Sequence, residues 1–450
     1  MTTPPPPAAG TERSVLERAL SPFADVRAGE GVSVLLMALN LFLVLAAYYM
    51  LKTIREAFIL AQGGAELKTY SAAGQAALLL VLVPAFAALA ARVNRLQLVR
   101  WVVLFFVSNL AIFFVLGRAG VRLGVPFFLW VGIFNVMVIA QFWAFANDIF
   151  TAEQGKRVFA VVGLGSNVGA WVGALVAGRL FRALGPYVLL VIAGAILCLC
   201  LFITHYLHHR QGRAERGAGG EEEAEKPLGG TDGAFGLIRK SRYLMLIAGL
   251  ILVLNVVNTS GEFLLGKYVV KESVEKFGSD PSSEDARERY IGEFYGDYFS
   301  WANIASFATQ MFLVSRIFRL LGVGGALFIH PIVALCGYLF MTRTPSLGFV
   351  RVLKIADNSI DYSLGNTAKQ ALWLPTSRQE KYKAKQAVDA FFMRAGDFLQ
   401  AIIVKVGTLM SVTIPGFAAL NVVLALGWLV IVALLGPENR RRMAAAGAES

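Results

Sequence analysis

Long apolar runs, separated by short polar segments, recur along this chain of 450 residues. A helix needs about 20 predominantly apolar residues to cross the hydrocarbon core of a bilayer. The pattern predicts twelve such spans, at residues 32–60, 71–91, 101–117, 124–149, 157–178, 186–207, 243–265, 294–315, 322–342, 346–374, 386–410 and 414–436. The predicted fold class is therefore an all-α membrane protein with twelve transmembrane helices in two six-helix halves.

Polar segments divide the chain into five predicted parts. The halves are residues 32–207 and 243–436, and residues 437–450 form a cytoplasmic C-terminal tail. The cytoplasmic N-terminal tail, residues 1–31, is rich in proline and carries a short amphipathic helix near residues 14–27. Residues 208–242 are rich in glycine and glutamate, a composition that cannot pack a core, so they form a cytoplasmic linker. No apolar segment with a cleavage site opens the chain, so we expect the first span to direct insertion.

Two short matches indicate that the halves are an internal repeat. One pattern after span four recurs after span ten at a shift of 225 residues, and one in span one recurs in span seven at a shift of 215. The matched residues are Thr151, Gln154 and Lys156 with Thr376, Gln379 and Lys381, and Leu39, Asn40 and Lys52 with Leu254, Asn255 and Lys267. Because both matches fall at corresponding spans, they favour duplication.

Composition and charge agree with this class. With 56% hydrophobic residues and a mean hydropathy of +0.61, the chain is too apolar for soluble domains of this size. The net charge of +12 fits either nucleic-acid binding or membrane topology. With both termini inside, the inner segments hold about 24 Lys and Arg and the outer ones about 11, the bias that cytoplasmic loops show. This placement favours topology, and we expect no nucleic-acid partner.

Charges also lie within the predicted spans, most densely between residues 351 and 405. On a helix, Arg351, Lys354, Asp357, Asp361 and Lys369 fall within an arc of roughly 120°. A charge at the bilayer centre costs at least about 2.5 kcal/mol, so this face points at partner helices or a wet cavity. We interpret it as the wall of a solute path.

Basic residues of three spans are candidates for binding an anion. Lys52 and Arg55 lie in the outer third of span one, Lys369 in span ten and Arg394 in span eleven. Arginine suits bidentate phosphate or carboxylate recognition, and lysine supplies a point charge. The competing interpretations are snorkelling of Lys52 and ion pairs that hold helices together. Candidate pairs are Lys52 with Glu56, Lys354 with Asp361, and Arg394 with Asp397.

Acidic and amide residues are candidates for coupling or gating. Asn147 and Asp148 lie at the inner end of span four, where a polar network could hold an inner gate closed. Alternatively, they only mark a helix C-terminus whose dipole interacts favourably with the nearby Lys156 and Arg157. The other candidates in this group are Glu56, Glu262, Asp357, Asp361 and Asp397.

Other features predict packing and exclude catalysis. Gly165, Gly169 and Gly173, at four-residue spacing in span five, permit close helix approach. Tyr362 and Trp373 are candidates for stacking on a base. The sequence contains no GxxxxGK[ST], HExxH or GxSxG motif, so we expect neither an enzyme nor ATP hydrolysis in this chain. We also expect no cofactor and no metal site.

Several stretches resemble the ATP:ADP antiporter family, which has a major-facilitator-like plan of twelve helices. They are LKTIREAFIL followed by GGAEL, FWAFANDIF, GKRVFAVVGLGSNVGA, DYSLGNTAKQALWLP and KYKAKQAVDAFFMRAGD. The chain departs from the family pattern at Arg55 for Lys, Glu56 for Asp and Gln370 for Glu, and LWVGIFNVMVIAQFW lacks a carboxylate. The resemblance implies that Arg55 and Lys369 contact phosphate and that Glu262 matches an acidic residue of span seven.

The expected function is secondary transport of an anionic solute by alternating access, with nucleotide exchange of the ATP/ADP type foremost. Another phosphorylated metabolite is a candidate substrate, and phosphate or protons are candidate coupling species. The alternative is proton-coupled transport of an unrelated metabolite, with Asp361, Asp357 or Glu262 carrying the proton; a non-transporting scaffold is a third. We expect a monomer that spans the bacterial plasma (inner) membrane many times, with both termini cytoplasmic.

Overall fold

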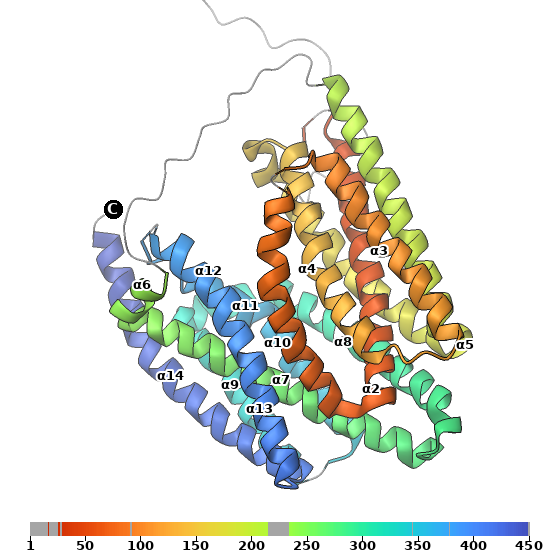
Figure 1. The fold of residues 1–450 in the computed structure, drawn as a ribbon. Helices are drawn as coiled ribbons and strands as arrows, with labels where there is room; N and C mark the ends of the chain where they lie inside the picture. Colours follow the sequence, from red (N-terminus) through yellow and green to blue (C-terminus); the bar gives the residue numbers. More distant parts are fainter. Residues whose placement is uncertain are drawn as a thin grey trace, which may run out of the picture.

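The computed structural model of the chain is built from helices (Figure 1). It describes Glu17 and residues 26–27, 29–90, 92–214, 234–343, 345–377 and 379–448, and every regular element among them is helical. Apart from Glu17 and residues 26–27, the predicted helix near residues 14–27 lies outside this part, and so do residues 215–233 of the predicted linker. We call residues 29–214 the N-terminal segment and residues 234–448 the C-terminal segment.

The helices follow one another with short connections. In the N-terminal segment they are α2 (Gly31–Ala90), α3 (Arg95–Arg118), α4 (Gly124–Ile149) and α5 (Ala152–Ala214). In the C-terminal segment they are α6 (Ala234–Lys240), α7 (Arg242–Phe277), η2 (Pro281–Ser283), α8 (Glu284–Phe312), α9 (Val314–Met341), α10 (Leu347–Ile360), η3 (Asp361–Gly365), α11 (Asn366–Ala371), η4 (Glu380–Ala384), α12 (Lys385–Ala387), η5 (Val388–Phe392), α13 (Met393–Leu409) and α14 (Ile414–Ala448).

Single glycines bend three of the long helices. Gly64 in α2, Gly185 in α5 and Gly322 in α9 have φ of 70°, 72° and 65°, a conformation that other residues rarely adopt. Each glycine falls at or beside a boundary predicted between two spans. Residues 61–70, predicted to be a loop, are therefore helical on both sides of Gly64.

Seven of the described helices are long and apolar enough to cross a membrane, judged by length and composition. Two of these, at Gly31–Ala90 and Arg157–Arg210, contain the breaks at Gly64 and Gly185 and so cover four predicted spans. The predicted spans eight, ten and eleven fall outside the seven, because α8 is polar and the other two carry charges and π-helical turns.

The glycines of span five bring two helices into backbone contact. A Cβ at Gly165, Gly169 or Gly173 would overlap a carbonyl oxygen of the first half of α2. The three carbonyls belong to Ala38, Phe42 and Ala46, which repeat with the same spacing of four. The predicted close approach is confirmed.

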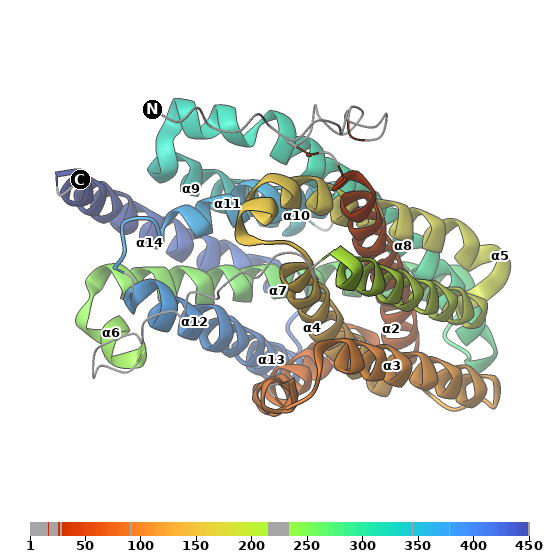
Figure 2. The same ribbon diagram turned by 90° about the horizontal axis from the view of Figure 1, so that it is seen from above.

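The two segments meet along α5 with α8 and along α2 with α7, α8 and α13 (Figure 2). Gly178 of α5 and Gly296 of α8 touch backbone to backbone. Two polar contacts join the segments near the breaks in α2 and α5. Lys267 Nζ lies 2.6 Å from Glu66 Oε1, and Arg289 Nη1 donates to the carbonyl of Arg182 at 2.9 Å.

Candidate functional site

A cavity of about 250 Å³ lies between the two segments. Residues from both halves of α2 and from α4, α7, α8, η3 and α13 line it. The lining is Lys52, Arg55, Glu56, Lys68, Thr69, Ala72, Gln75, Phe128, Asn258, Thr259, Glu262, Phe263, Phe299, Tyr362, Arg394, Asp397 and Gln400. We call it the central cavity. It holds four bases and three acids, an excess of one positive charge.

Glu56 is the anionic centre of this cavity. It is 1% exposed and accepts hydrogen bonds from Arg55, with Nε at 3.1 Å from Oε1. Its other oxygen lies 2.7 Å from Lys68 Nζ. Lys68 also lies 3.6 Å from Glu262 Oε2 on α7, so it bridges the two segments. One carboxylate thus holds two cations that face the cavity.

Lys52 is the cation that these acids leave uncompensated. Among the described residues no carboxylate oxygen lies within 4.0 Å of its ammonium, so the predicted pair with Glu56 is wrong. The ammonium instead lies over the rings of Phe299 and Tyr49, 4.2 and 5.2 Å from their centroids. Aromatic faces attract a cation but leave its charge available to an anion.

Arg394 and Asp397 form the ion pair that their spacing predicted, at 3.6 Å between Nη1 and Oδ2. Asn255 of α7 donates to the other carboxylate oxygen of Asp397 at 2.9 Å and to the carbonyl of Met393 at 2.7 Å. Asp397 therefore has neighbours that fix its position on α13.

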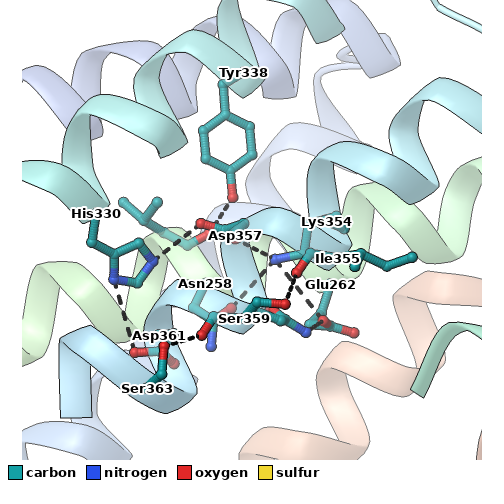
Figure 3. A network of polar contacts seen from close by, with 12 residues as sticks. Asn258, Glu262, His330, Tyr338, Lys354, Ile355, Asp357, Ser359, Asp361 and Ser363 are labelled. Atoms are coloured by element: carbon teal, nitrogen blue, oxygen red, sulfur yellow. Dashed lines mark hydrogen bonds and ion pairs between the residues drawn. The ribbon is translucent and has the colours of Figure 1, made fainter. Parts of the chain in front are cut away.

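Lys354 and Asp357, on the charged face of α10, are buried among helices (Figure 3). Lys354 is 1% exposed and lies 2.7 Å from Asp357 Oδ2, and His330 Nε2 of α9 lies 3.1 Å from Asp357 Oδ1. The predicted pairing of Lys354 with Asp361 is wrong, because Asp357 stands one turn away while the helix widens into η3 at Asp361. Glu262 lies 3.9 Å from Lys354 and connects this network to the central cavity.

Lys369 lies outside the central cavity, as does most of the predicted face. Its ammonium is 3.2 Å from Asp361 Oδ1. Arg351 lies 3.7 Å from Asp297 and lines a second cavity of about 560 Å³. Of the stretch from 351 to 371, Tyr362 alone lines the central cavity. Most of the charged face thus packs against partner helices in the core of the C-terminal segment and does not line the central cavity.

Asn147 and Asp148 are exposed at the end of α4 and line none of the described cavities. The helix ends at Ile149, and Thr151 and Gln154 then form a reciprocal capping box that starts α5.

Several residues of these clusters were not predicted from the sequence, among them Lys68, Gln75, Gln400 and His330. Lys68 lies between the predicted spans one and two, although the pair Gly63–Gly64 signals a helix break that places Lys68 in the next helix. Gln75 and Gln400 are neutral and gave no charge signal, yet they line the cavity. His330 stands beside Pro331 in an apolar run, and a lone histidine there indicates nothing about its partners.

Comparisons with known proteins find relatives in sequence and in fold. A family model described as TLC ATP/ADP transporter matches residues 128–346, just under half of the chain. ADP,ATP carrier protein 1 of Chlamydia muridarum is 24% identical over 355 residues, which cover 70% of this chain and 64% of that protein. The chloroplastic ADP,ATP carrier protein 1 of Arabidopsis thaliana is 25% identical over 340 residues, 66% of this chain and 50% of that protein. The chain therefore spans less than two thirds of the length of these relatives.

Solved structures of transporters share the fold. The nucleoside transporter NupG aligns with a TM-score of 0.61 at 15% identity, covering 88% of this chain and 98% of that one. The peptide transporter PepTSo of the POT family aligns with a TM-score of 0.62 at 11% identity, covering 91% and 98%. The chain is thus similar to the TLC ATP/ADP transporter family, the resemblance that its motifs predicted, and it shares its helical fold with these solved transporters.

Proposed function

We propose that this protein is a secondary-active transporter that exchanges nucleotides of the ATP/ADP type by alternating access. Its substrate site is the central cavity, and it works as a monomer in a bacterial inner membrane with both termini in the cytoplasm. The observation that carries the proposal is the excess positive charge, held at Lys52, in a cavity between two segments of an ATP/ADP transporter relative. Polyanionic phosphates are the solutes that such a cavity favours.

The proposed phosphate site consists of Lys52, Arg55 and Lys68. A bound phosphate group takes Lys52 directly and competes with Glu56 for the other two cations. Arg55 also lies over the ring of Phe128, 4.6 Å from its centroid, which orients the guanidinium. The residues expected from the sequence are retained in part: Lys52 and Arg55 bind phosphate, Arg394 lies in the same cavity, and Lys369 orders Asp361 instead.

Exchange follows from the bridge between Lys68 and Glu262. With no substrate, Lys68 links Glu56 to the other segment and holds the two together. A phosphate that takes Lys68 replaces this link, so the segments separate on that side only when the anion is bound. Glu56 and Glu262 are thereby the coupling residues, and Asp397 positions Arg394. A ligand moves such an equilibrium only through different affinities for its two states, and competition for Lys68 supplies this difference.

The proposal includes two six-helix halves that move against each other. Equivalent breaks support the repeat: Gly64 and Gly278 have positive φ at a shift of 214, and Gly185 and Ser411 have it at a shift of 226. The capping box of Thr151 and Gln154 recurs at Ser377 and Glu380, again at 226. The sequence match of Thr151 with Thr376, at a shift of 225, is thus offset by one residue from this repeat of the helix starts.

Uptake of labelled ATP into proteoliposomes tests the function. Vesicles that carry the purified protein are loaded with ADP, phosphate or nothing, with and without a pH gradient. We expect uptake to require internal nucleotide or phosphate, and Lys52→Gln to lower it by about tenfold or more, since a charge-assisted contact contributes about 1.5–3 kcal/mol.

Lys405→Gln is the matched control, because Lys405 is an exposed lysine of α13 that does not line the cavity. Its uptake should equal that of the wild type. Uptake that a pH gradient drives into empty vesicles, or full activity of Lys52→Gln, would contradict exchange through this cavity.

A further inference from the structure

The central cavity is also lined by neutral polar side chains, glutamines among them, on two helices that face each other. Thr69, Ala72 and Gln75 line it from the second half of α2. Arg394, Asp397 and Gln400 line it from α13. Both sets repeat every three residues, and the two helices pack together across the boundary between segments. Each helix thus contributes one glutamine to the same cavity.

These glutamines carry buried polar atoms that the protein leaves unpaired. Gln400 is 1% exposed, and neither its amide nitrogen nor its oxygen has a hydrogen-bond partner among the described residues. Gln75 Oε1 is likewise buried without a partner there. Packing fixes Gln75, because its amide group touches Gly132 of α4 where any Cβ would overlap it. Buried polar groups are nearly always satisfied, so an unpaired amide that lines a cavity indicates a missing partner.

Gln75 and the phosphate site lie at different depths of one cavity. Lys68 and Gln75 are seven residues apart on the same helix, about 10 Å along its axis. A nucleotide has the same polarity, with charge at the phosphates and hydrogen-bonding groups at the base. Tyr362, which is 41% exposed and lines the cavity, offers an aromatic face on which a base can stack.

We propose that Gln400, assisted by Gln75, reads the nucleobase and selects adenine. This inference rests on the proposed function, since it names the part of the site that contacts the base. A glutamine amide places a donor beside an acceptor, which matches the adjacent N6 donor and N7 acceptor of adenine. Gln75 Oε1 accepts the second hydrogen of such an amino group. Guanine presents an acceptor at position 6 and leaves this oxygen unpaired.

Direct binding measurements separate the base from the phosphates. ATP, GTP and inorganic tripolyphosphate are titrated into the purified full-length protein in detergent by calorimetry. We expect the wild type to bind ATP more tightly than GTP or tripolyphosphate. Gln400→Leu should weaken ATP binding by about tenfold or more, the range for a bidentate base contact, and leave tripolyphosphate binding unchanged. Gln75→Leu should act in the same direction with a smaller loss.

Asn421→Leu is the matched control. Asn421 is a buried amide of α14 whose two polar atoms also lack partners among the described residues, but it does not line the cavity. Its affinities for ATP and GTP should keep the wild-type ratio. An unchanged ATP affinity in Gln400→Leu, or an equal loss for ATP and tripolyphosphate, would overturn base reading while leaving nucleotide exchange in place. A wild type that neither binds nor exchanges ATP would overturn the proposed function itself.

Discussion

Lys354 and Glu288 are both buried, but they differ in whether opposite or like charges surround them. Lys354 faces Asp357 directly, and His330 and Glu262 stand around the pair, so its charge is compensated. Glu288, in the first turns of α8 and outside the predicted spans, is 7% exposed and has two acidic neighbours, Asp285 and Glu284. Burial, followed by these acids, raises the pKa of Glu288 from 4.5 to about 8.

The raised pKa makes stability depend on pH at this end of α8. The folded state keeps the proton on Glu288 up to about pH 8, whereas the unfolded state releases it near pH 4.5. The folded state therefore binds more protons between these values, and its stability falls as pH rises through them. We expect Glu288→Gln, which cannot ionise, to melt at a higher temperature than the wild type at pH 8.5 and at the same temperature near pH 4.5. Thermal unfolding in detergent at both pH values measures this, and equal melting at pH 8.5 would disprove it.

The sequence indicated most of the charged residues that line the central cavity, but it was less successful in predicting which residues pair with each other. The pair of Arg394 with Asp397 follows from helical spacing, because both residues lie on one regular helix. Lys52 and Lys354 were assigned partners by the same rule, and both assignments fail. Lys68, from beyond the break at Gly64, takes Glu56 instead, and helical spacing carries no information across a break.

At the scale of elements, the glycine stripe of α5 sets the distance between two helices. Gly169→Ala places a methyl group against the carbonyl of Phe42, and backbone cannot rotate away as a side chain can. We expect this substitution to cost about 1–3 kcal/mol, the usual range for overpacking. Thermal unfolding in detergent measures the loss. Gly163→Ala is the control, since a Cβ there meets nothing within 4 Å. Equal melting temperatures of the two variants would contradict the close approach.

Helix positions were accessible to sequence analysis because their signals are local. Hydropathy located the segments, and Gly64, Gly185 and Gly322 ended helices near predicted boundaries. The π-helical turns at η3, η4 and η5 have no comparable signal, and they change which residues share a face. The 120° arc that an ideal α-helix predicts for the charged residues up to Lys369 therefore does not hold beyond Asp361.

At the scale of the whole molecule, ion pairs join the two segments, and the charges of such a pair can be reversed by mutation. Lys267 and Glu66 lie 2.6 Å apart near the break in α2, and Lys68 and Glu262 face each other one turn deeper. Both contacts lie on the side that the sequence predicts to be outer. In the proposed cycle, substrate replaces the contact between Lys68 and Glu262. The contact between Lys267 and Glu66 then still joins the two segments, so its strength determines how readily this side opens.

Charge reversal tests this arrangement. Glu66→Lys places two ammonium groups at one contact, and Lys267→Glu places two carboxylates there, so each single variant should hold the outer side open. The probe is Thr69→Cys in a background without Cys198, Cys200 and Cys336, labelled from outside by a membrane-impermeant maleimide, because Thr69 lines the central cavity. We expect faster labelling in each single reversal and a return toward the unreversed rate in the double reversal, since opposite charges then face each other again. Labelling that is equally fast in the double reversal would show that the pair itself does not hold the segments, and that their packing at Gly178 and Gly296 closes this side without it.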